Sequence, residues 1–245
     1  MTAMSEPWTR KEVIGDCTLY LGNSLEVMPV LGKIDACVMD PPYGIGESAG
    51  KAKTRTSGLT SKINGAHKYQ RNYGDKDWDD VTADDAVNMA VSICKNAIIF
   101  GGNYYQLPPT SCWLVWDKEN GATDFADCEL AWTNLPKAVR RLKFLWNGCM
   151  RKERHIPRQH PTQKPVGVME WCIGHLPKTS ETILDPFMGS GTTLVACAKL
   201  GRKGIGIELD PDYFQIACER VQAAYDQPDL FVAPPKAPVQ EGMDV

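Results

Sequence analysis

The sequence predicts an α/β fold with a mostly parallel central sheet, and three observations point to it. Short apolar runs of strand length alternate with segments whose apolar residues recur at helical spacing. A glycine-rich stretch over residues 185–193 leads from one such run into a helical segment. The next apolar run ends on an acid, Glu208. A glycine-rich strand-to-helix turn with an acid one strand later is typical of α/β sheets that bind nucleotides.

The length and composition suit one large intracellular domain. Within the 245 residues we place the domain at 1–228, followed by a disordered tail at 229–245 that is rich in proline, alanine and charge. Nine cysteines are scattered without CxxC pairs or His/Cys clusters at zinc spacing, so we expect reduced thiols and no metal site. The sequence shows no signal sequence and no apolar run of membrane-spanning length. We therefore expect a cytoplasmic protein without a membrane partner.

The first half of the domain opens with a βαβ-like pattern. We expect strands at 17–21 and 34–39, joined through a helical turn at 24–31. Residues 44–77 lose apolar periodicity and fill with Gly, Ser, Thr, Lys and Asn, which predicts a long functional loop, and helical spacing returns over 79–95. Further strand candidates lie at 97–100, 112–116, 129–132 and 142–146.

The second half alternates helices and strands. A helix is expected at 165–176, with Pro165 near its first turn. It is followed by a strand at 182–184, a helix at about 192–200, a strand at 203–207 and a helix at about 211–225. Trp113, Trp116, Trp132 and Trp146 have strand-like spacings, which favours core packing for most of them.

The tetrapeptide Asp40-Pro41-Pro42-Tyr43 ends the predicted strand at 34–39. Proline lacks an N–H and fixes φ, so the pair stops sheet pairing and leaves the carbonyls of Asp40 and Pro41 as acceptors in a rigid turn. Acceptors beside an aromatic ring suit a planar amine, with Tyr43 stacking on the base that carries it. An ordinary strand-terminating turn with Tyr43 in the core is the alternative.

The glycine-rich turn is a nucleotide-type turn that completes no phosphate motif. A P-loop requires a lysine after Gly191, and the dinucleotide fingerprint requires glycine at position 194, where leucine stands. Glu208 lies where an acid accepts hydrogen bonds from both hydroxyls of a ribose. These residues predict a nucleoside cofactor without separating NAD from S-adenosylmethionine. The alternative is a glycine used for helix packing beside a surface glutamate.

Basic residues concentrate in two segments, although the formal net charge is −3. Residues 51–71 carry only basic charges, and residues 137–158 carry eight against the single acid Glu153. Such local concentrations favour contact with a polyanion. A solvated loop face is the alternative for either run taken alone.

Taken together, these residues resemble the amino-group DNA methyltransferases over nearly the whole chain. Asp40-Pro41-Pro42-Tyr43 resembles their catalytic motif and residues 185–193 resemble their S-adenosylmethionine motif. Residues 160–165 resemble the segment that contacts the methionine end of the cofactor, and residues 22–24 resemble the segment that contacts its adenine ring. The catalytic motif comes first, as in the circularly permuted β group, and the likeness is greatest to small phage and prophage members.

The resemblance implies a Rossmann-like S-adenosylmethionine-dependent methyltransferase fold and methylation of N6 of a flipped adenine in double-stranded DNA. Tyr43 then stacks on the base, Asp40 and the Pro41 carbonyl accept from its amine, and Pro42 holds that geometry. The implied cofactor-binding residues are Asn23, Ser24, His160, Thr162, Lys164, Asp185, Phe187, Gly189, Gly191 and Glu208. Asn23 departs from the Asp of many relatives. A solvated Lys164 and a structural His160 are the alternatives for those two residues.

The DNA-contact insertions are expected at about 45–77 and 134–160, with basic side chains going mainly to phosphates. The candidates are Lys51, Lys53, Arg55, Lys62, Lys68, Arg71, Arg140, Arg141, Arg151, Lys152 and Arg154. Family members of this motif order often form homodimers. A partner restriction nuclease and a recognition sequence cannot be inferred from these residues.

Other functions stay open to different degrees. Methylation of cytosine N4 needs the same acceptor geometry, although the Asp form of the motif leans toward adenine in this family. Methylation of cytosine carbon 5 is disfavoured because it needs a cysteine, usually after proline, and no Pro-Cys occurs. A protein-glutamine methyltransferase is disfavoured by the Asp and by the motif order. An inactive DNA-binding relative is the alternative from another class, and a dehydrogenase is a distant third.

Overall fold

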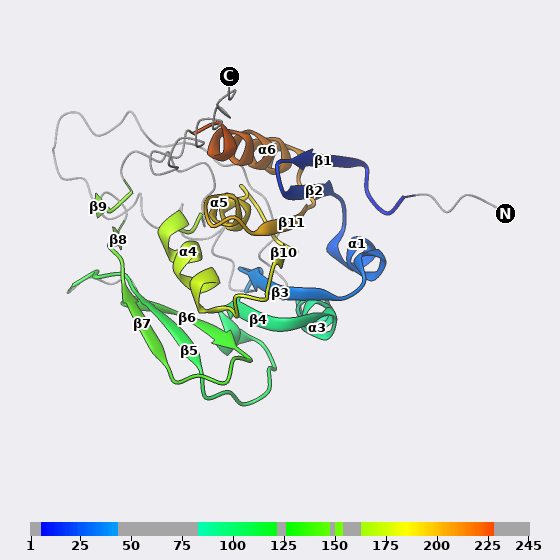
Figure 1. Cartoon of the computed structure of the whole chain (residues 1–245). Helices are drawn as coiled ribbons and strands as arrows, with labels where there is room; N and C mark the ends of the chain where they lie inside the picture. The colour runs from blue at the N-terminus through cyan, green and yellow to red at the C-terminus, as the bar shows by residue number, and fades with distance from the viewer. Residues whose placement is uncertain (1–5, 44–82, 122–125, 148–149, 154–162, 228–245) are drawn as a thin grey trace, which may run out of the picture.

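The computed structural model describes residues 6–43, 83–121, 126–147, 150–153 and 163–227 (Figure 1). Within these ranges, nine strands form one sheet in the order β1-β2-β11-β10-β3-β4-β6-β5-β7. The strands are β1 (Arg10–Ile14), β2 (Cys17–Leu21), β3 (Ile34–Met39), β4 (Cys94–Phe100), β5 (Trp113–Asp117), β6 (Cys128–Thr133), β7 (Arg140–Lys143), β10 (Thr182–Asp185) and β11 (Lys203–Glu208). A separate antiparallel pair joins β8 (Trp146–Asn147) and β9 (Met150–Arg151).

The centre of the sheet is parallel, as the sequence predicts. Strands β2, β11, β10, β3 and β4 pair with one another in parallel. Antiparallel pairing is confined to the sides, where β1 forms a hairpin with β2 and where β6 pairs with both β4 and β5. The α/β class with a mostly parallel central sheet is confirmed.

Helices cover both faces of the sheet, and Figure 1 shows the two layers. One face carries α4 (Val166–His175), α5 (Thr192–Lys199) and α6 (Pro211–Asp226), and the other carries α1 (Ser24–Leu31) and α3 (Asp84–Ile93). Neighbouring residues of one strand therefore enter different cores: Val38 and Ile98 pack on the first face, and Met39 and Ile99 on the second. This explains why β3 and β4 end in continuous apolar stretches, residues 36–39 and 97–100, instead of alternating ones.

The connections diverge from the boundary between β3 and β10, which are neighbours in the sheet. From β3 the chain reaches β4 on one side, with α3 packed on one face. From β10 it reaches β11 on the other side, with α5 packed on the opposite face. Two connections that run to opposite sides of the sheet in this way leave a crevice at the carboxyl ends of their strands, where α/β sheets bind ligands.

The larger differences from the sequence predictions concern three elements. The helix expected over 79–95 ends at Ile93, because Cys94 already pairs with Ile34 of β3 in extended backbone. The single strand expected at 142–146 is two strands, β7 pairing with β5 and β8 pairing with β9. Strand β1 was not expected at all. The predicted loop at 44–77 and the predicted tail at 229–245 lie outside the described residues.

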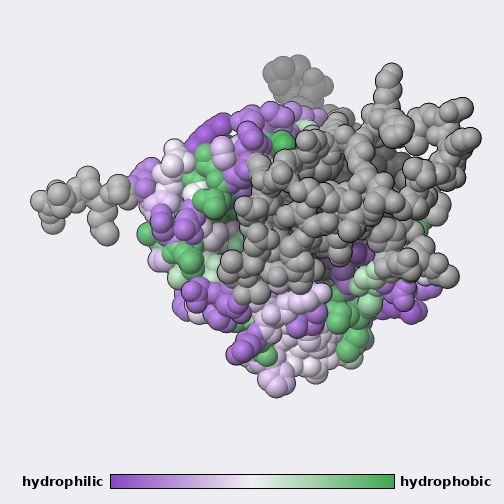
Figure 2. Space-filling model, turned by 180° about the vertical axis from the view of Figure 1, so that it is seen from behind, coloured by the Kyte–Doolittle hydropathy of each residue, from purple (hydrophilic) through white to green (hydrophobic). Residues whose placement is uncertain are grey.

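Among the described residues, the exposed large apolar side chains come from several elements and turns, with two of them on α1. They are Val13, Leu25, Val30, Tyr104, Val139, Leu200 and Leu209. Figure 2 shows hydrophilic and hydrophobic residues interspersed over the described part of one face. Among the helices that the structure describes, none combines the length and the apolar character needed to cross a membrane.

Candidate active site

A cavity of about 1010 Å³ lies at the carboxyl ends of the central strands. Its wall includes Asp40 directly after β3, Asp185 at the end of β10 and Glu208 at the end of β11. This is the crevice expected where the two crossovers part. Most of the residues predicted for catalysis or cofactor binding line it: Asn23, Ser24, Asp40, Pro42, Lys164, Asp185, Phe187, Gly189 and Glu208.

Asp185 organises the glycine-rich turn from inside the protein. One carboxylate oxygen accepts from the backbone N–H of Phe187 at 3.0 Å and the other accepts from the Thr193 hydroxyl at 2.5 Å. Burial raises the pKa of Asp185 to about 7, because the desolvation of the charge outweighs the two hydrogen bonds that favour it. The carboxyl therefore fixes the turn and changes its charge near neutral pH.

The raised pKa of Asp185 predicts a stability that falls as the pH rises. In the folded protein this carboxyl keeps its proton up to about pH 7, whereas the unfolded chain releases it near pH 4. The stabilisation is therefore complete at low pH and is lost as the pH passes through the folded-state pKa. We expect the free energy of unfolding of the wild type, relative to Asp185→Asn, to drop by about 2–3 kcal/mol between pH 5 and pH 8.

Urea unfolding of both proteins at the two pH values measures this difference. Glu170→Gln, which removes a carboxylate from the partly exposed ion pair with Lys199, controls for the loss of one charge. A wild-type minus Asp185→Asn difference that stays constant from pH 5 to pH 8 would contradict the raised pKa.

Glu208 is held in one orientation by backbone donors. Its Oε2 accepts from the N–H of Gly189 at 2.9 Å, and its Oε1 accepts from the N–H of Asp210 at 2.8 Å. Burial raises its pKa against these hydrogen bonds. Each carboxylate oxygen has a second lone pair, so the oriented group can accept further hydrogen bonds from hydroxyls in the cavity.

Asn23 and Ser24, at the start of helix α1, also line the cavity. The Asn23 side chain caps the helix by accepting from the N–H of Leu25 at 2.9 Å. The Ser24 hydroxyl donates to the carbonyl of Pro186 at 2.5 Å, which ties α1 to the glycine-rich turn. An amide in place of the family's carboxylate thus serves the cap, and both residues still line the cavity.

Gly191 has a packing role that differs from its predicted cofactor contact. It lies at the start of α5 with φ of 77°, in the left-handed region that favours glycine. A Cβ at this position would lie 2.9 Å from the Cβ of Ala217 on α6. Glycine at this position therefore lets α5 and α6 approach closely. A contact between Gly191 and the cofactor stays a prediction.

The predicted catalytic motif, to which Tyr43 belongs, is held by contacts of Tyr43, Tyr104 and Tyr105. The Tyr43 hydroxyl donates to Oδ1 of Asp40 at 2.5 Å, and the Tyr105 hydroxyl donates to the Pro42 carbonyl. The Tyr43 ring stacks on Tyr104, with centroids 5.0 Å apart and planes inclined by 17°. Tyr43 is half-buried and its ring lies against Gly101, a glycine with φ of 62°. The motif is thus a braced turn at the cavity edge.

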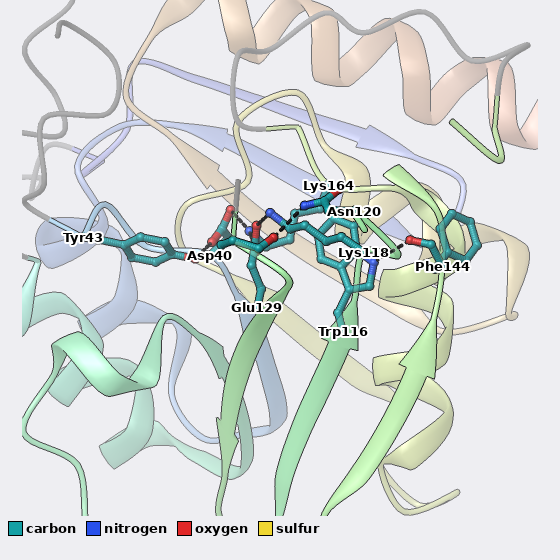
Figure 3. A network of polar contacts seen from close by, with 9 residues as sticks. Asp40, Tyr43, Trp116, Lys118, Asn120, Glu129, Phe144 and Lys164 are labelled. Atoms are coloured by element: carbon teal, nitrogen blue, oxygen red, sulfur yellow. Dashed lines mark hydrogen bonds and ion pairs between the residues drawn. The ribbon is translucent and has the colours of Figure 1, made fainter. Parts of the chain in front are cut away.

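Lys164 joins Asp40 to a residue that the sequence did not indicate. Its Nζ lies 2.7 Å from Oδ2 of Asp40 and 2.9 Å from Oε2 of Glu129, and Figure 3 shows the three side chains converging. Glu129 comes from β6, and its other oxygen lies 2.5 Å from Nζ of Lys118. Lys164 is 7% exposed, so the alternative of a solvated lysine is wrong. Its contact with a methionine carboxylate stays a prediction.

Burial and ion pairing shift the pKa values of the groups in this cluster in opposite directions. Burial raises the pKa of Asp40, and the Lys164 ammonium only partly offsets this. Burial would also raise the pKa of Glu129, but Lys164 and Lys118 together lower it to about 2. The two carboxylates raise the pKa of Lys164 against its burial. The Tyr43 pKa is raised by burial and by Asp40, so its hydroxyl stays a donor.

The predicted DNA contacts are described only in part. Lys51, Lys53, Arg55, Lys62, Lys68, Arg71 and Arg154 lie outside the described residues, as do His160 and Thr162 of the cofactor prediction. Arg140 and Arg141 are exposed on β7, the edge strand of the sheet, and Lys152 is exposed beside the Phe144 ring. Arg151 belongs to β9. A role of these residues in DNA contact stays a prediction.

The comparison with known proteins agrees with the geometry of the site. Residues 106–219 match the family model described as DNA methylase. The Type II methyltransferase M2.LlaDCHI of Lactococcus lactis subsp. cremoris is 42% identical over 83 residues, which cover 34% of this chain and 31% of the relative. M.HinfI of Haemophilus influenzae is 26% identical over 292 residues, covering 94% of this chain and 77% of the relative. The matches to M2.LlaDCHI and M2.DpnII span about a third of those relatives' length, at 31% and 32%.

Solved structures share the fold. The crystal structure of the M1.HpyAVI–SAM complex superposes with a TM-score of 0.52 at 22% identity, over 84% of this chain and 98% of that one. The PvuII DNA methyltransferase, named as cytosine-N4-specific, gives a TM-score of 0.52 at 15% identity, over 89% and 95%. The family model and the similarity to Type II methyltransferases support an amino-group DNA methyltransferase family member, and the solved structures show the fold.

Proposed function

We propose that the chain is an S-adenosylmethionine-dependent DNA methyltransferase that modifies N6 of adenine. The observation that carries the proposal is one cavity bounded by both predicted half-sites. Asp40 stands at the end of β3, and Asp185 and Glu208 stand at the ends of β10 and β11 on the same cavity wall. A group bound against Glu208 would thus share the cavity with an amine at Asp40.

The cavity fits the chemistry of the cofactor. Its volume of about 1010 Å³ lies at the upper end of the roughly 300–1,000 Å³ range of small-molecule sites. Glu208, oriented by the N–H groups of Gly189 and Asp210, would accept from the ribose hydroxyls. Phe187 offers an apolar surface, and Asn23 and Ser24, which also line the cavity, would contact the adenine ring. When bound, the cofactor supplies a methyl group on a positively charged sulfur.

Methyl transfer to an amine needs an oriented lone pair and an acceptor for the positive charge that develops on nitrogen. Asp40 is suited to be that acceptor, because the Tyr43 hydroxyl and the Lys164 ammonium fix its two oxygens. Each oxygen retains a second lone pair for an amine hydrogen. The chain would bind, orient and stabilise without a covalent intermediate on the protein.

The choice of adenine rests on the Asp at the start of the tetrapeptide, since the Asp form leans toward adenine among relatives. The acceptor geometry serves cytosine N4 equally well, and PvuII is a cytosine-N4-specific protein of the same fold. The alternative target is therefore cytosine N4.

Expression in a host that lacks DNA methylation, followed by genome sequencing with a base-modification readout, tests the proposal. We expect N6-methyladenine within one short sequence motif, and no modification with Asp40→Ala. N4-methylcytosine would move the target to cytosine. An unmodified genome, together with DNA binding by the purified protein, would support the inactive DNA-binding relative, and binding of NAD in preference to S-adenosylmethionine would revive a dehydrogenase.

A further inference from the structure

A row of alternating charges runs from the catalytic turn into the antiparallel side of the sheet. The neutral Tyr43 hydroxyl contacts Asp40 at one end, and the charges then pass from Asp40 through Lys164 and Glu129 to Lys118 (Figure 3). Successive heavy-atom distances along it are 2.5, 2.7, 2.9 and 2.5 Å. The row leaves the cavity, since Glu129 and Lys118 do not line it.

Stability alone gives a poor reason for this row. Removing two carboxylates and two ammonium groups from water costs several kcal/mol per ion, and apolar residues of similar volume often stabilise a protein as well or better. Trp116 on β5, the strand that Lys118 follows, and Trp132 on β6 are already buried in the core. What the row achieves that apolar residues would not is a fixed position for the Lys164 ammonium beside Asp40.

We propose that Glu129 is a positioning residue for methyl transfer, which with Lys118 holds Lys164 and so sets how strongly Asp40 accepts a proton or a hydrogen bond. The inference rests on the proposed function for the role of Asp40. Lys164 is shared between two carboxylates, so Asp40 has a cation beside it without being fully neutralised by it. Glu129 acts through Lys164 and touches neither cofactor nor base.

Removing Glu129 and removing Lys164 should shift the pKa of Asp40 in opposite directions. Without Glu129, Asp40 loses a nearby negative charge and gains a larger share of Lys164, so its pKa falls and it becomes a weaker acceptor. Without Lys164, Asp40 loses its cation and still faces Glu129, so its pKa rises. A role confined to packing would give no such pair of opposite shifts.

Other charged or titratable groups also face Asp40 and must be kept unchanged. Tyr43 belongs to the same turn as Asp40, and Lys164 precedes α4. Glu129 lies on β6, and Asp185 at the end of β10 interacts with Asp40 through space. Glu129→Gln and Lys164→Met each alter one of these groups and leave the others in place.

The test measures the titration of Asp40 by ¹³C carboxyl NMR and the pH dependence of kcat for the wild type, Glu129→Gln and Lys164→Met. We expect the Asp40 titration and the acidic limb of kcat to move to lower pH in Glu129→Gln and to higher pH in Lys164→Met. In Glu129→Gln, kcat should fall by on the order of 10²-fold with KM for S-adenosylmethionine unchanged. Glu170→Gln, at the ion pair with Lys199 between α4 and α5, is the matched control.

Different results would overturn the role of Glu129 and the proposed methyltransferase function. If the Asp40 titration shifts as expected while even the wild type transfers no methyl group, the charge row stands and the proposed function falls. If Glu129→Gln leaves both the titration and kcat at wild-type values, the role of Glu129 is overturned. Weakened S-adenosylmethionine binding in Lys164→Met with an unmoved titration would instead place Lys164 on the cofactor. Should Glu129→Gln not fold, Lys118→Met removes the outer anchor and is expected to lower kcat at unchanged KM.

Discussion

Replacing Asp40 with alanine is expected to lower kcat for methyl transfer by about 10²–10³-fold or more, with S-adenosylmethionine binding close to that of the wild type. Removing a preorganised group that stabilises developing charge typically costs this much. Asp40 is a large part of that group here, because both of its oxygens are fixed by the Tyr43 hydroxyl and the Lys164 ammonium. Transfer of a labelled methyl group to unmethylated DNA and calorimetric titration with the cofactor measure the two quantities.

Glu26→Ala is a suitable control, since it removes an exposed carboxylate from α1. The variant should match the wild type in both measurements. A rate for Asp40→Ala within a few-fold of the wild type would remove Asp40 from catalysis. A loss of cofactor binding equal to the loss of rate would instead assign Asp40 to the architecture of the cavity.

Gly101→Ala is expected to damage both the fold and the reaction. Gly101 has φ of 62°, and a Cβ built there would overlap the ring of Tyr43. The left-handed backbone costs a side chain about 1–2 kcal/mol, and overpacking against the ring adds about 1–3 kcal/mol. Displacing Tyr43 also breaks its hydrogen bond to Asp40, so we expect kcat to fall by on the order of 10²-fold.

Gly201→Ala separates the two causes. Gly201 has nearly the same φ, 63°, but a Cβ there meets nothing within 4 Å. It should lose only the backbone contribution to stability and keep wild-type activity. Urea unfolding and methyl-transfer assays on both variants test this, and equal losses in the two proteins would show that the Tyr43 ring does not depend on Gly101.

The elements that carry the cavity were predictable because their signals are local. Asp40 directly follows a mostly apolar strand, and Glu208 ends the strand that comes after the glycine-rich turn and its helix. Parallel strands bring such carboxyl ends together at one edge of a sheet. Strand β1 was not predicted, because most of its residues are polar and most are exposed. Its hairpin with β2 has a two-residue Gly15-Asp16 connection between the paired residues Ile14 and Cys17, which is a recognisable turn signal.

The partners of Lys164 could not be predicted in this way. Glu129 lies on β6, which pairs antiparallel with β4, and Lys118 follows β5, which pairs with β6. No local pattern in the sequence states that β6 is inserted between β4 and β5, and so none places Glu129 near Asp40. Within a strand, one half-buried acid among apolar residues looks like a surface position. The packing role of Gly191 was hidden for the same reason, since Ala217 approaches it from a distant helix.

The parallel pairing of β2 with β11 has a consequence for how the protein is made. Cys17 pairs with Gly204, and Leu21 pairs with Glu208, so residues 17–21 cannot pair on this side until residues 204–208 have been synthesised. On a ribosome, β2 and α1 leave the exit tunnel long before their sheet neighbour has been synthesised. Pairings across such sequence separations form late and slowly, and leave strand edges open in the meantime. The cavity is therefore completed only after β11 has been synthesised, and a chain cut short before β11 would lack Glu208 and the wall that it forms.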